Sequence, residues 1–356
     1  MKTETTLSIP ITKRVQTKIN EVDFSKLKFG EVFTDHMLIS DYKNGSWQTP
    51  EIVPYGPITL EPSAKVFHYG QAIFEGMKAY KDEDGRVWLF RPDQNFIRIN
   101  KSAERLAIPE IPEEFFMEGL QQLIHLERDW VKQGEGNSLY IRPFMIATQP
   151  GVSASPANEY RFMIILAPAQ AYFAGDVRVA IAEKYSRSAD GGIGYAKAAG
   201  NYAGQFYPTA LAQQEGFQQV IWTDASTHEY IEEAGTMNVF VRIGDQLLTA
   251  PVSDRILDGV TRKSIVTLAK DMDIPLEVRP IKVQEVVEAA RDGELKEMFG
   301  AGTAAVISPI LGFSYKGERF ELPSVADGYG PQFKKRLLDI QYNRTEDPYG
   351  WRVEVK

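Results

Sequence analysis

The 356-residue sequence contains no cysteine, and this absence excludes several kinds of chemistry. Without thiols the chain can form no disulfide bond, no thiolate metal site and no cysteine nucleophile. Its four histidines are scattered, without the spacing of metal ligands: His36, His68, His125 and His228. We therefore expect no metal centre, and a catalytic nucleophile has to come from another residue type.

Long hydrophobic runs are also missing. The stretch from Met1 to Leu7 lacks the apolar segment of a signal peptide, and no apolar run is long enough to span a bilayer. Forty basic residues against 48 acidic ones give a formal net charge of −8, which disfavours nucleic acid as a partner. These features predict a cytoplasmic protein that acts on neither membranes nor nucleic acid.

The pattern of apolar residues predicts an α+β fold with two domains, because helical and strand periodicities alternate along a chain of this length. Residues 1 to about 28 are polar and predict a surface arm. The segment 138–146 alternates like a strand, and 160–167 is an apolar strand followed by a linker-like composition. We predict an N-terminal domain of residues 1–167, a linker of residues 168–176, and a C-terminal domain of residues 177–356.

Familiar catalytic and nucleotide-binding signatures do not occur. The sequence has no G-x-G-x-x-G, no phosphate-loop G-K-[ST], no G-x-S-x-G and no H-E-x-x-H. Dinucleotide-binding, phosphate-loop, serine-hydrolase and zinc-protease functions therefore have no support.

Lys197 lies in an unusual stretch. It is the only residue from Gly191 to Gln214 that is charged at neutral pH, and the glycines and alanines around it leave space for a planar ligand. A lysine amine kept from water by apolar neighbours can attack carbonyl groups and form a Schiff base, for which pyridoxal phosphate is the obvious carbonyl compound. A glycine-rich surface loop with one solvated lysine would show the same pattern.

Four other stretches have the composition of ligand contacts. Glu232 and Glu233 are paired carboxylates ahead of Gly235-Thr236; one of them could hold a protonated pyridine nitrogen, or both could belong to a charged turn. Gly259-Val260-Thr261 opens a predicted helix and could bind an anion, although every helix has such an end. The glycine-rich stretch 299–305 could form an anion nest or a tight turn, and Arg98 could reach a phosphate or be solvated.

Eight segments then occur in a fixed order: Phe33 to Met37, Phe74 to Ala79, Leu89 to Pro92, Tyr140 to Pro143, Lys197 with Gly200 to Tyr202, Glu233 with Gly235 to Asn238, Gly259 to Arg262, and Gly302 to Ala304. In order and spacing they resemble branched-chain amino acid aminotransferases over about residues 28–345. That family belongs to the fold type IV pyridoxal-phosphate enzymes. The resemblance implies a smaller N-terminal α/β domain, a larger C-terminal pseudo-barrel domain, and a homodimer with pyridoxal phosphate at the domain interface.

The resemblance also implies roles for individual residues. Lys197 is similar to the Schiff-base lysine that shuttles the substrate proton, Glu233 to the acid at the pyridine nitrogen, and Tyr202 to the tyrosine beside the ring's phenolic oxygen. Four positions match phosphate contacts: Arg98, Val260, Thr261 and Thr303. Thr236 and the backbone of Ala304 match the contacts to the substrate carboxylate. Six positions match the side-chain pocket: Phe29, Tyr69, Phe74, Tyr140, Arg142 and Tyr172.

The sequence pattern itself also supports a place for Arg142 in the side-chain pocket. Tyr140 and Arg142 are two residues apart in an alternating strand, so both side chains face the same side. Arg142 could pair there with the γ-carboxylate of a glutamate substrate, or it could be held by a structural carboxylate.

The implied reaction is ping-pong transfer of the amino group between leucine, isoleucine or valine and 2-oxoglutarate. Mammalian members of the family carry a Cys-x-x-Cys after the last motif, where this chain has Ala305 and Ser308, so thiol redox control is not expected. D-amino-acid transaminases and aminodeoxychorismate lyases share the lysine and the phosphate contacts, but they resemble the chain less in segments 33–37 and 140–143. A non-catalytic binding protein on the same scaffold is a third alternative, which the presence of both Lys197 and Glu233 disfavours.

Overall fold

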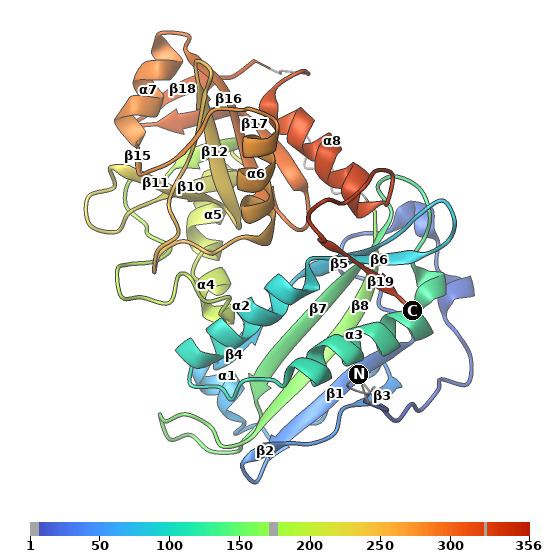
Figure 1. Cartoon of the computed structure of the whole chain (residues 1–356). Coiled ribbons are helices and arrows are strands. Elements are labelled where there is room, and N and C mark those ends of the chain that lie inside the picture. The colour runs from blue at the N-terminus through green and yellow to red at the C-terminus, as the bar shows by residue number, and fades with distance from the viewer. Residues whose placement is uncertain (1–6, 171–176, 324–325) are drawn as a thin grey trace. The chain divides into compact units, whose positions relative to one another are not determined.

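The computed structural model describes residues 7–170, 177–323 and 326–356, which divide into two compact units (Figure 1). Among these residues the first unit contains 7–170, 197–199 and 339–356, and the second contains 177–196, 200–323 and 326–338. The sequence had assigned 197–199 and 339–356 to the second domain. They join the first unit because the lysine segment and the last strand both pair with its sheet.

The first unit is built on a nine-stranded sheet in which every pairing of strands is antiparallel. Its strands are β1 (His36–Lys43), β2 (Ser46–Trp47), β3 (Glu51–Pro54), β4 (Ala72–Phe74), β5 (Met77–Lys81), β6 (Val87–Phe90), β7 (Ser138–Ala147), β8 (Tyr160–Ala169) and β19 (Arg352–Val355). They follow the order β19-β6-β5-β7-β8-β1-β2, with β3 on β1 and β4 on β7.

Two helices cover one face of this sheet, α2 (Pro92–Arg105) and α3 (Glu113–Leu126), as Figure 1 shows. Pro92 stands at the first turn of α2, where a missing N–H costs nothing. Apolar side chains from both helices meet those of the strands in one core, which includes Ile99, Phe116 and Ile141. The remaining short helices of the unit are α1 (Lys65–Tyr69) and the 3₁₀ turns η1 (Ile19–Glu21), η2 (Phe24–Lys26) and η3 (Arg128–Trp130).

The second unit contains a ten-stranded sheet. Its strands are β9 (Val177–Ile181), β10 (Gln219–Thr223), β11 (Tyr230–Ala234), β12 (Met237–Ile243), β13 (Gln246–Thr249), β14 (Leu276–Val278), β15 (Ile281–Lys282), β16 (Leu295–Gly302), β17 (Val306–Tyr315) and β18 (Glu318–Glu321). The order β12-β16-β17-β9-β10-β11 returns to β12 through the β11–β12 pairing, so six strands close into a barrel.

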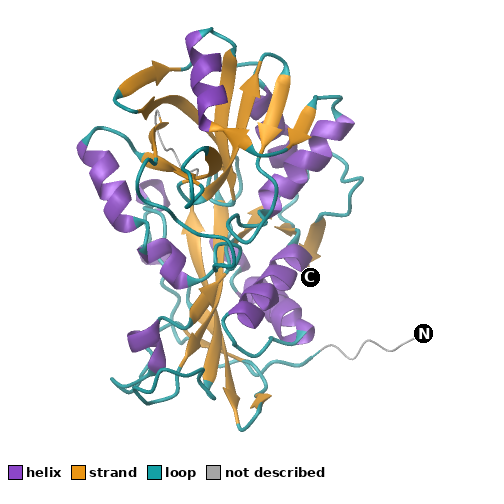
Figure 2. Ribbon diagram, turned by 90° about the vertical axis from the view of Figure 1, so that its left-hand side faces the viewer, coloured by secondary structure: helices purple, strands orange, loops and turns teal. Residues whose placement is uncertain are grey.

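Helices accompany the barrel strands: α5 (Phe206–Gln214), α6 (Val260–Asp271) and α7 (Val283–Arg291). Two further helices, α4 (Ala199–Ala203) and α8 (Tyr329–Gln341), include the points at which the chain passes from one unit to the other. Figure 2 shows helices beside strands in both units, which confirms the predicted α+β class with its barrel.

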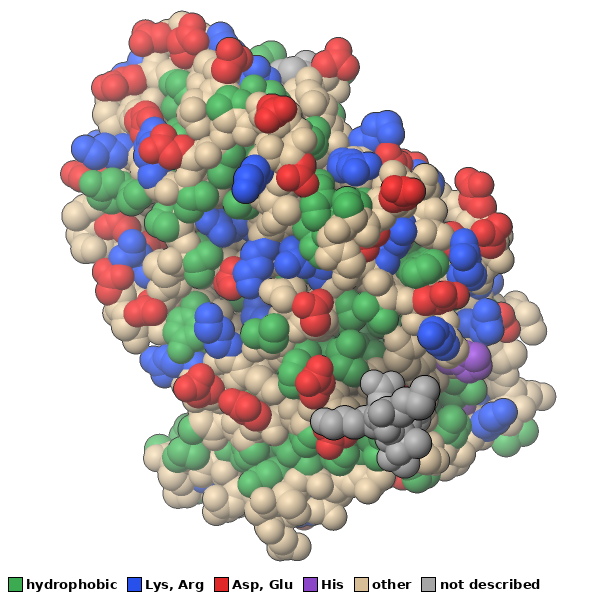
Figure 3. Space-filling view, viewed as in Figure 1, with side chains coloured by type: hydrophobic (Ala, Val, Ile, Leu, Met, Phe, Trp, Pro, Cys, Tyr) green, Lys and Arg blue, Asp and Glu red, His purple; other side chains and the backbone are tan. Residues whose placement is uncertain are grey.

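The distribution of charge and the lengths of the helices bear on which ligands and surroundings the protein suits. Acidic and basic side chains both occur across the face shown in Figure 3, on a chain with a formal net charge of −8. Within the described residues, no helix is long and apolar enough to cross a membrane, and no group of three or more His, Asp or Glu side chains is placed to hold a metal ion.

Candidate active site

An aromatic and cationic cluster lies on the face of β7 that is turned away from the core. Burial alternates along this strand, so Leu139 and Ile141 point into the core while Tyr140 and Arg142 share the opposite face. Nη2 of Arg142 donates to the Tyr140 hydroxyl at 2.8 Å. The prediction that these two side chains share one face of the strand is therefore confirmed, and they also bond to each other.

Aromatic rings surround this arginine. The guanidinium carbon of Arg142 lies 4.5 Å from the centroid of the Phe74 ring, and the ring of Phe29 meets Tyr140 edge-on at 4.8 Å. No carboxylate of the described residues pairs with Arg142, and its Nε is a buried donor without a hydrogen-bond partner. The described residues thus give no support to the alternative of a structural carboxylate, and the arrangement suits an anionic group with apolar neighbours.

Gly76 makes this cluster possible. A Cβ atom at this position would lie 2.4 Å from the Tyr140 hydroxyl, far inside contact distance. The glycine therefore lets the backbone after β4 approach Tyr140, which in turn sets the position of the Arg142 side chain.

Lys197 is tied to the same unit through its own backbone. Its carbonyl accepts from the Phe74 amide at 3.0 Å, and its amide donates to the Ser102 hydroxyl at 2.9 Å. The half-buried side chain places Nζ 5.0 Å from the centroid of the Phe74 ring. The alternative of a fully solvated lysine therefore does not describe this side chain, and Lys197 and Arg142 both lie against the Phe74 ring.

A polar stripe on α2 supports the lysine. Asn95, Arg98 and Ser102 are spaced to lie on one side of the helix, and all three are buried. Arg98 donates to the two oxygens of Glu75 at 2.7 and 2.8 Å, and Asn95 donates to the same carboxylate at 2.7 Å. Ser102 reaches the lysine amide, so one helix holds both Glu75 and Lys197.

Glu75 is fully buried, and its surroundings determine its charge. Burial alone would raise the pKa of this carboxyl, but the charge and hydrogen bonds of Arg98 and the charge of Lys197 outweigh it and hold the pKa below the usual value. Arg98 is therefore not solvated, since its Nε and Nη2 both donate to Glu75. Glu75 lies in the segment 74–79 of the family resemblance, for which the sequence predicted no role of this carboxylate.

Two further residues were predicted to line the substrate pocket. Tyr69, on α1, is 44% exposed, and its hydroxyl donates to the carbonyl of Val152. Tyr172 lies outside the described residues.

The second unit holds the other predicted groups around Glu233 on β11. This carboxylate is 3% exposed. Its Oε1 accepts from the Leu257 amide at 2.8 Å and from the Asn238 side chain at 3.4 Å, while Nε of Arg187 lies 2.9 Å from Oε2. Glu233 is thus a buried carboxylate with at least three partners, none of which the sequence had indicated.

Its neighbour Glu232 has different partners. Successive side chains of a strand face opposite sides, and Glu232 accepts from Nε of Arg255, which also pairs with Asp190. Burial raises the pKa of Glu232 even though Arg255 opposes the shift.

Helix α6 begins close to the same acid. Gly259 is its N-cap and no side chain caps the first turn, so backbone N–H groups at Val260 and Thr261 lie where an anion is stabilised. A Cβ atom at Gly259 would lie 1.9 Å from Oδ1 of Asn238, the residue that also contacts Glu233. Asn238 therefore braces both the acid and the segment that leads into α6.

Two hairpin turns emerge at one edge of the barrel. Thr236 lies in the β11–β12 turn, and Thr303 and Ala304 lie in the β16–β17 turn. Asn238 pairs with Ala301 across β12 and β16, so both turns occur at the same end of these strands. Val306, which closes the second turn, has a φ of 61°, a conformation that a β-branched residue adopts only under strain.

Tyr202 lies on α4, half-buried, in the helix that follows the lysine. The neighbouring Asn201 donates to the carbonyls of Ile193 and Ala196 at 2.7 and 2.9 Å. The helix start therefore fixes the glycine-rich segment on the N-terminal side of Lys197.

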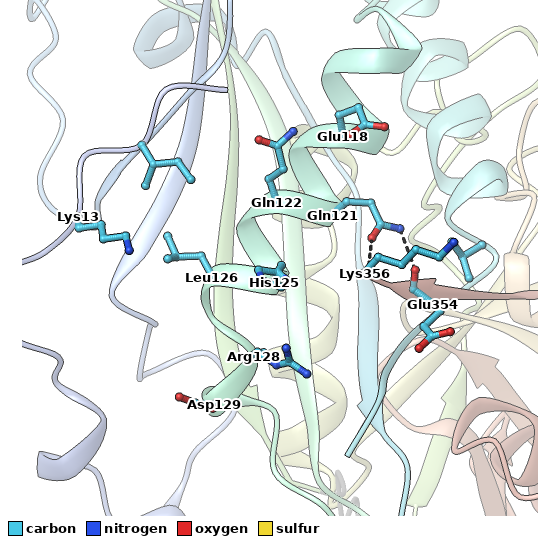
Figure 4. A pocket seen from close by; sticks show the side chains of 12 residues that line it. Lys13, Glu118, Gln121, Gln122, His125, Leu126, Arg128, Asp129, Glu354 and Lys356 are labelled. Carbon is cyan, nitrogen blue, oxygen red and sulfur yellow. Dashed lines mark hydrogen bonds between the residues drawn. The ribbon is translucent and has the colours of Figure 1, made fainter. Parts of the chain in front are cut away.

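A separate groove of about 890 Å³ lies on the first unit beside α3 (Figure 4). The Gln121 side chain at its edge donates to the carbonyl of Glu354 at 3.2 Å and accepts from the amide of Lys356 at 3.3 Å. None of the predicted site residues lines this groove, and its charged side chains have both signs. We assign it no role in the chemistry.

Each unit, taken by itself, supplies groups whose chemistry fits pyridoxal phosphate. An amine is present at Lys197, a buried carboxylate at Glu233, and an uncapped helix start at Val260. The carboxylate suits a protonated pyridine nitrogen and the helix start suits a phosphate. The buried donor Nε of Arg142 adds a place for a substrate anion.

Comparisons with known proteins agree with this chemistry. The sequence profile of the family described as "Amino-transferase class IV" matches residues 72–313. Branched-chain-amino-acid transaminase 1 of Bacillus subtilis (strain 168) is 45% identical over 342 residues, 94% of this chain and 95% of that protein.

Solved structures show the same fold. A branched-chain aminotransferase from the archaeon Thermoproteus uzoniensis, crystallised with norvaline, has a TM-score of 0.75 at 23% identity and covers 90% of this chain and 100% of that chain. The pyridoxal-phosphate form of the enzyme from Thermobaculum terrenum has a TM-score of 0.74 at 18% identity, covering 90% and 98%.

Proposed function

Since the chain belongs to the class IV aminotransferases, we propose that it is a branched-chain amino acid aminotransferase dependent on pyridoxal phosphate. It transfers the amino group reversibly between L-leucine, L-isoleucine or L-valine and 2-oxoglutarate, giving the branched-chain 2-oxo acid and L-glutamate. The observation that carries the proposal is Arg142, a cation with a buried donor that lies among Phe74, Tyr140 and the lysine segment.

The residues divide the work by their chemistry. Lys197 would hold the cofactor through Nζ, and the same amine would move the proton at the α-carbon of the substrate. Glu233 would hold the proton on the pyridine nitrogen, and Tyr202 would donate to the phenolic oxygen of the ring. The bound cofactor supplies an electron-withdrawing ring that stabilises the charge left at the α-carbon. The phosphate would be held by Val260, Thr261 and Thr303, together with Arg98 beside its bonds to Glu75.

The substrate pocket has to accept two unlike side chains in turn. Phe29, Phe74 and Tyr140 provide apolar walls for a branched side chain, and a bare carboxylate among them would be unfavourable by several kcal/mol. Arg142 offsets this cost for the γ-carboxylate of glutamate. The proposed contacts to the substrate are completed by Tyr69, Tyr172, Thr236 and the backbone of Ala304.

We also propose a cytoplasmic homodimer. Phe67, Tyr69 and Val152 are 62%, 44% and 66% exposed, and Tyr69 and Val152 are joined by a hydrogen bond. Apolar side chains gathered in this way on a surface are typical of an interface. Sedimentation or light scattering on the holoenzyme tests the assembly, and a monomer with full activity would contradict it.

The function is tested by turnover of purified protein with a panel of amino donors and 2-oxoglutarate. We expect L-leucine, L-isoleucine and L-valine to react and D-alanine not to react, which separates this activity from that of a D-amino-acid transaminase. Lys197→Ala should reduce turnover to a trace, and borohydride should label Lys197 in the wild-type holoenzyme. Labelling of another lysine would refute the assignment.

The role of Arg142 is tested by Arg142→Met in the two half-reactions, each followed through the absorbance of the cofactor. We expect kcat/KM for glutamate and 2-oxoglutarate to fall about 30-fold or more, because truncating one partner of a buried charge pair costs at least 2 kcal/mol. The leucine half-reaction should fall much less. Arg161→Met, which breaks an arginine–Asp41 pair on β8, is the matched control. Equal losses for both substrates would indicate a structural role.

A further inference from the structure

Two adjacent buried acids on β11 each have their own arginine. Glu232 and Glu233 are 2% and 3% exposed, and they face opposite sides of the strand. Arg255 pairs with Glu232, and Arg187 lies 2.9 Å from Glu233. The proposed function uses Glu233 but leaves Arg187 without a role.

The Arg187 side chain is only 4% exposed and is anchored at its far end. Its terminal nitrogens donate to the carbonyl of Gly194, at 3.3 Å, and Nη2 also donates to the carbonyl of Arg255. Its Nε faces Oε2 of Glu233, but the N–H is not aligned for a hydrogen bond. The effect of Arg187 on Glu233 is therefore that of a fixed positive charge rather than of a shared hydrogen.

The positive charge of Arg187 lies next to two adjacent buried carboxylates, Glu232 and Glu233. A buried carboxylate beside a second carboxylate takes up a proton unless a cation compensates it. A protonated, neutral Glu233 would lack the negative charge that stabilises a proton on the pyridine nitrogen. The cations that the described residues place against this pair of acids are Arg187 and Arg255, and Asp190 shares the charge of Arg255. Arg187 is thus the cation that is directed at Glu233.

We propose that Arg187 is a positioning residue that keeps Glu233 ionised and so keeps the pyridine nitrogen of the cofactor protonated. The inference rests on the proposed function and adds to it a residue that touches neither the substrate nor the reacting atoms. The hydrogen bonds from Arg187 to the Gly194 carbonyl also hold the segment that leads to Lys197, because Gly194 precedes Lys197 by three residues. A Cβ at Gly194 would lie 2.6 Å from the carbonyl of Arg255, which shows how closely this segment is packed.

The test uses holoenzyme reconstituted with pyridoxal phosphate labelled with ¹⁵N in the ring, whose NMR shift reports whether that nitrogen is protonated. Arg187→Met removes the charge, so we expect the shift to move toward that of an unprotonated pyridine and kcat to fall about 10-fold or more, with KM changed by less than about threefold. Arg187→Lys keeps a positive charge and should retain the wild-type shift.

Arg255→Met is the matched control, since it removes the arginine of Glu232. We expect it to lower the melting temperature of the cofactor-free protein while leaving the ¹⁵N shift unchanged. If Arg187→Met does not fold, Arg187→Gln and Arg187→Lys decide the question, because they differ in charge while both alter the shape. A wild-type shift in Arg187→Met or Arg187→Gln, or the same altered shift in the lysine variant, would overturn the proposal.

The proposed function fails in a different way. Glu233→Gln should move the ¹⁵N shift in the same direction as Arg187→Met. If Glu233→Gln left the shift unchanged, the role of Glu233 would be wrong, and with it the basis for Arg187. If Glu233→Gln moved the shift and Arg187→Met did not, only the inference about Arg187 would fall.

Discussion

Replacing Glu75 by glutamine should destabilise the first unit strongly. The carboxylate is 0% exposed and accepts two hydrogen bonds from Arg98, one from Asn95 and one from the Gly76 amide. Glutamine keeps the shape but leaves the buried guanidinium of Arg98 without its counter-charge. Breaking a buried ion pair in this way costs about 3–5 kcal/mol, which is a large part of the stability of a typical domain.

The assay is thermal unfolding of the cofactor-free protein. For a unit of this size, 1 kcal/mol shifts the melting temperature by about 2–4 °C, so Glu75→Gln should lower it by roughly 6–20 °C. Glu110→Gln is the control, because Glu110 is exposed in the same unit and its side chain makes no hydrogen bond to a described residue. It should shift the melting temperature by about 1 °C or less.

The difference between wild type and variant should depend on pH. The pKa of Glu75 lies below its ordinary value of 4.5 in the folded state, because Arg98 and Lys197 outweigh the effect of burial. The stability that the ionised carboxyl contributes is therefore complete above about pH 4.5 and is lost as the pH falls through the folded pKa. A constant difference down to pH 3, or a melting temperature that is unchanged at pH 7, would refute the account of the Glu75–Arg98 pair.

Three further predictions concern residues around the site. Gly76→Ala puts a methyl group 2.4 Å from the Tyr140 hydroxyl; steady-state kinetics should show a larger loss of kcat/KM for glutamate than for leucine, with destabilisation of about 1–3 kcal/mol in urea. Glu233→Gln should reduce kcat by orders of magnitude, whereas Glu232→Gln should mainly lower stability, and the reverse result would shift the assignment of this strand by one residue. Gly259→Ala places a Cβ 1.9 Å from Asn238 and should weaken retention of the cofactor during dialysis, measured by its absorbance; full retention would argue against a phosphate site at α6.

The sequence predicts the elements whose signal is local. Alternation in residues 138–146 correctly predicts β7 and the shared face of Tyr140 and Arg142, since a period of two fixes the side on which each residue lies. The glycine-rich surroundings of Lys197 are also a local signal, and they predict a segment with space for a ligand beside the amine. Both signals are contained within about ten neighbouring residues.

Partners that are distant in the sequence have no such signal. Glu75 contacts Arg98, and Arg187 approaches Glu233, only after the chain has folded. The residues next to an arginine in the sequence do not reveal such a distant partner, so the side chain would be predicted to be solvated. The return of residues 339–356 to the first unit is also invisible locally, because an edge strand such as β19 is short and its pairing depends on β6. The positions of Tyr202, Thr236 and Thr303 were predicted from family resemblance, and their roles stay predictions.

The return of β19 to the first unit affects how that unit can fold during translation. Strand β6 lies between β5 and β19, so before residues 352–355 are made it is the open edge of the sheet. The separation is long: Asn343 is 261 residues after Asp82, to which it donates a hydrogen bond. At about 5–20 residues per second a ribosome needs roughly 13–52 s to bridge that interval. During this time the nascent chain exposes the unpaired N–H and C=O groups of β6, and chaperone contacts with ribosome-bound chains are expected to concentrate there.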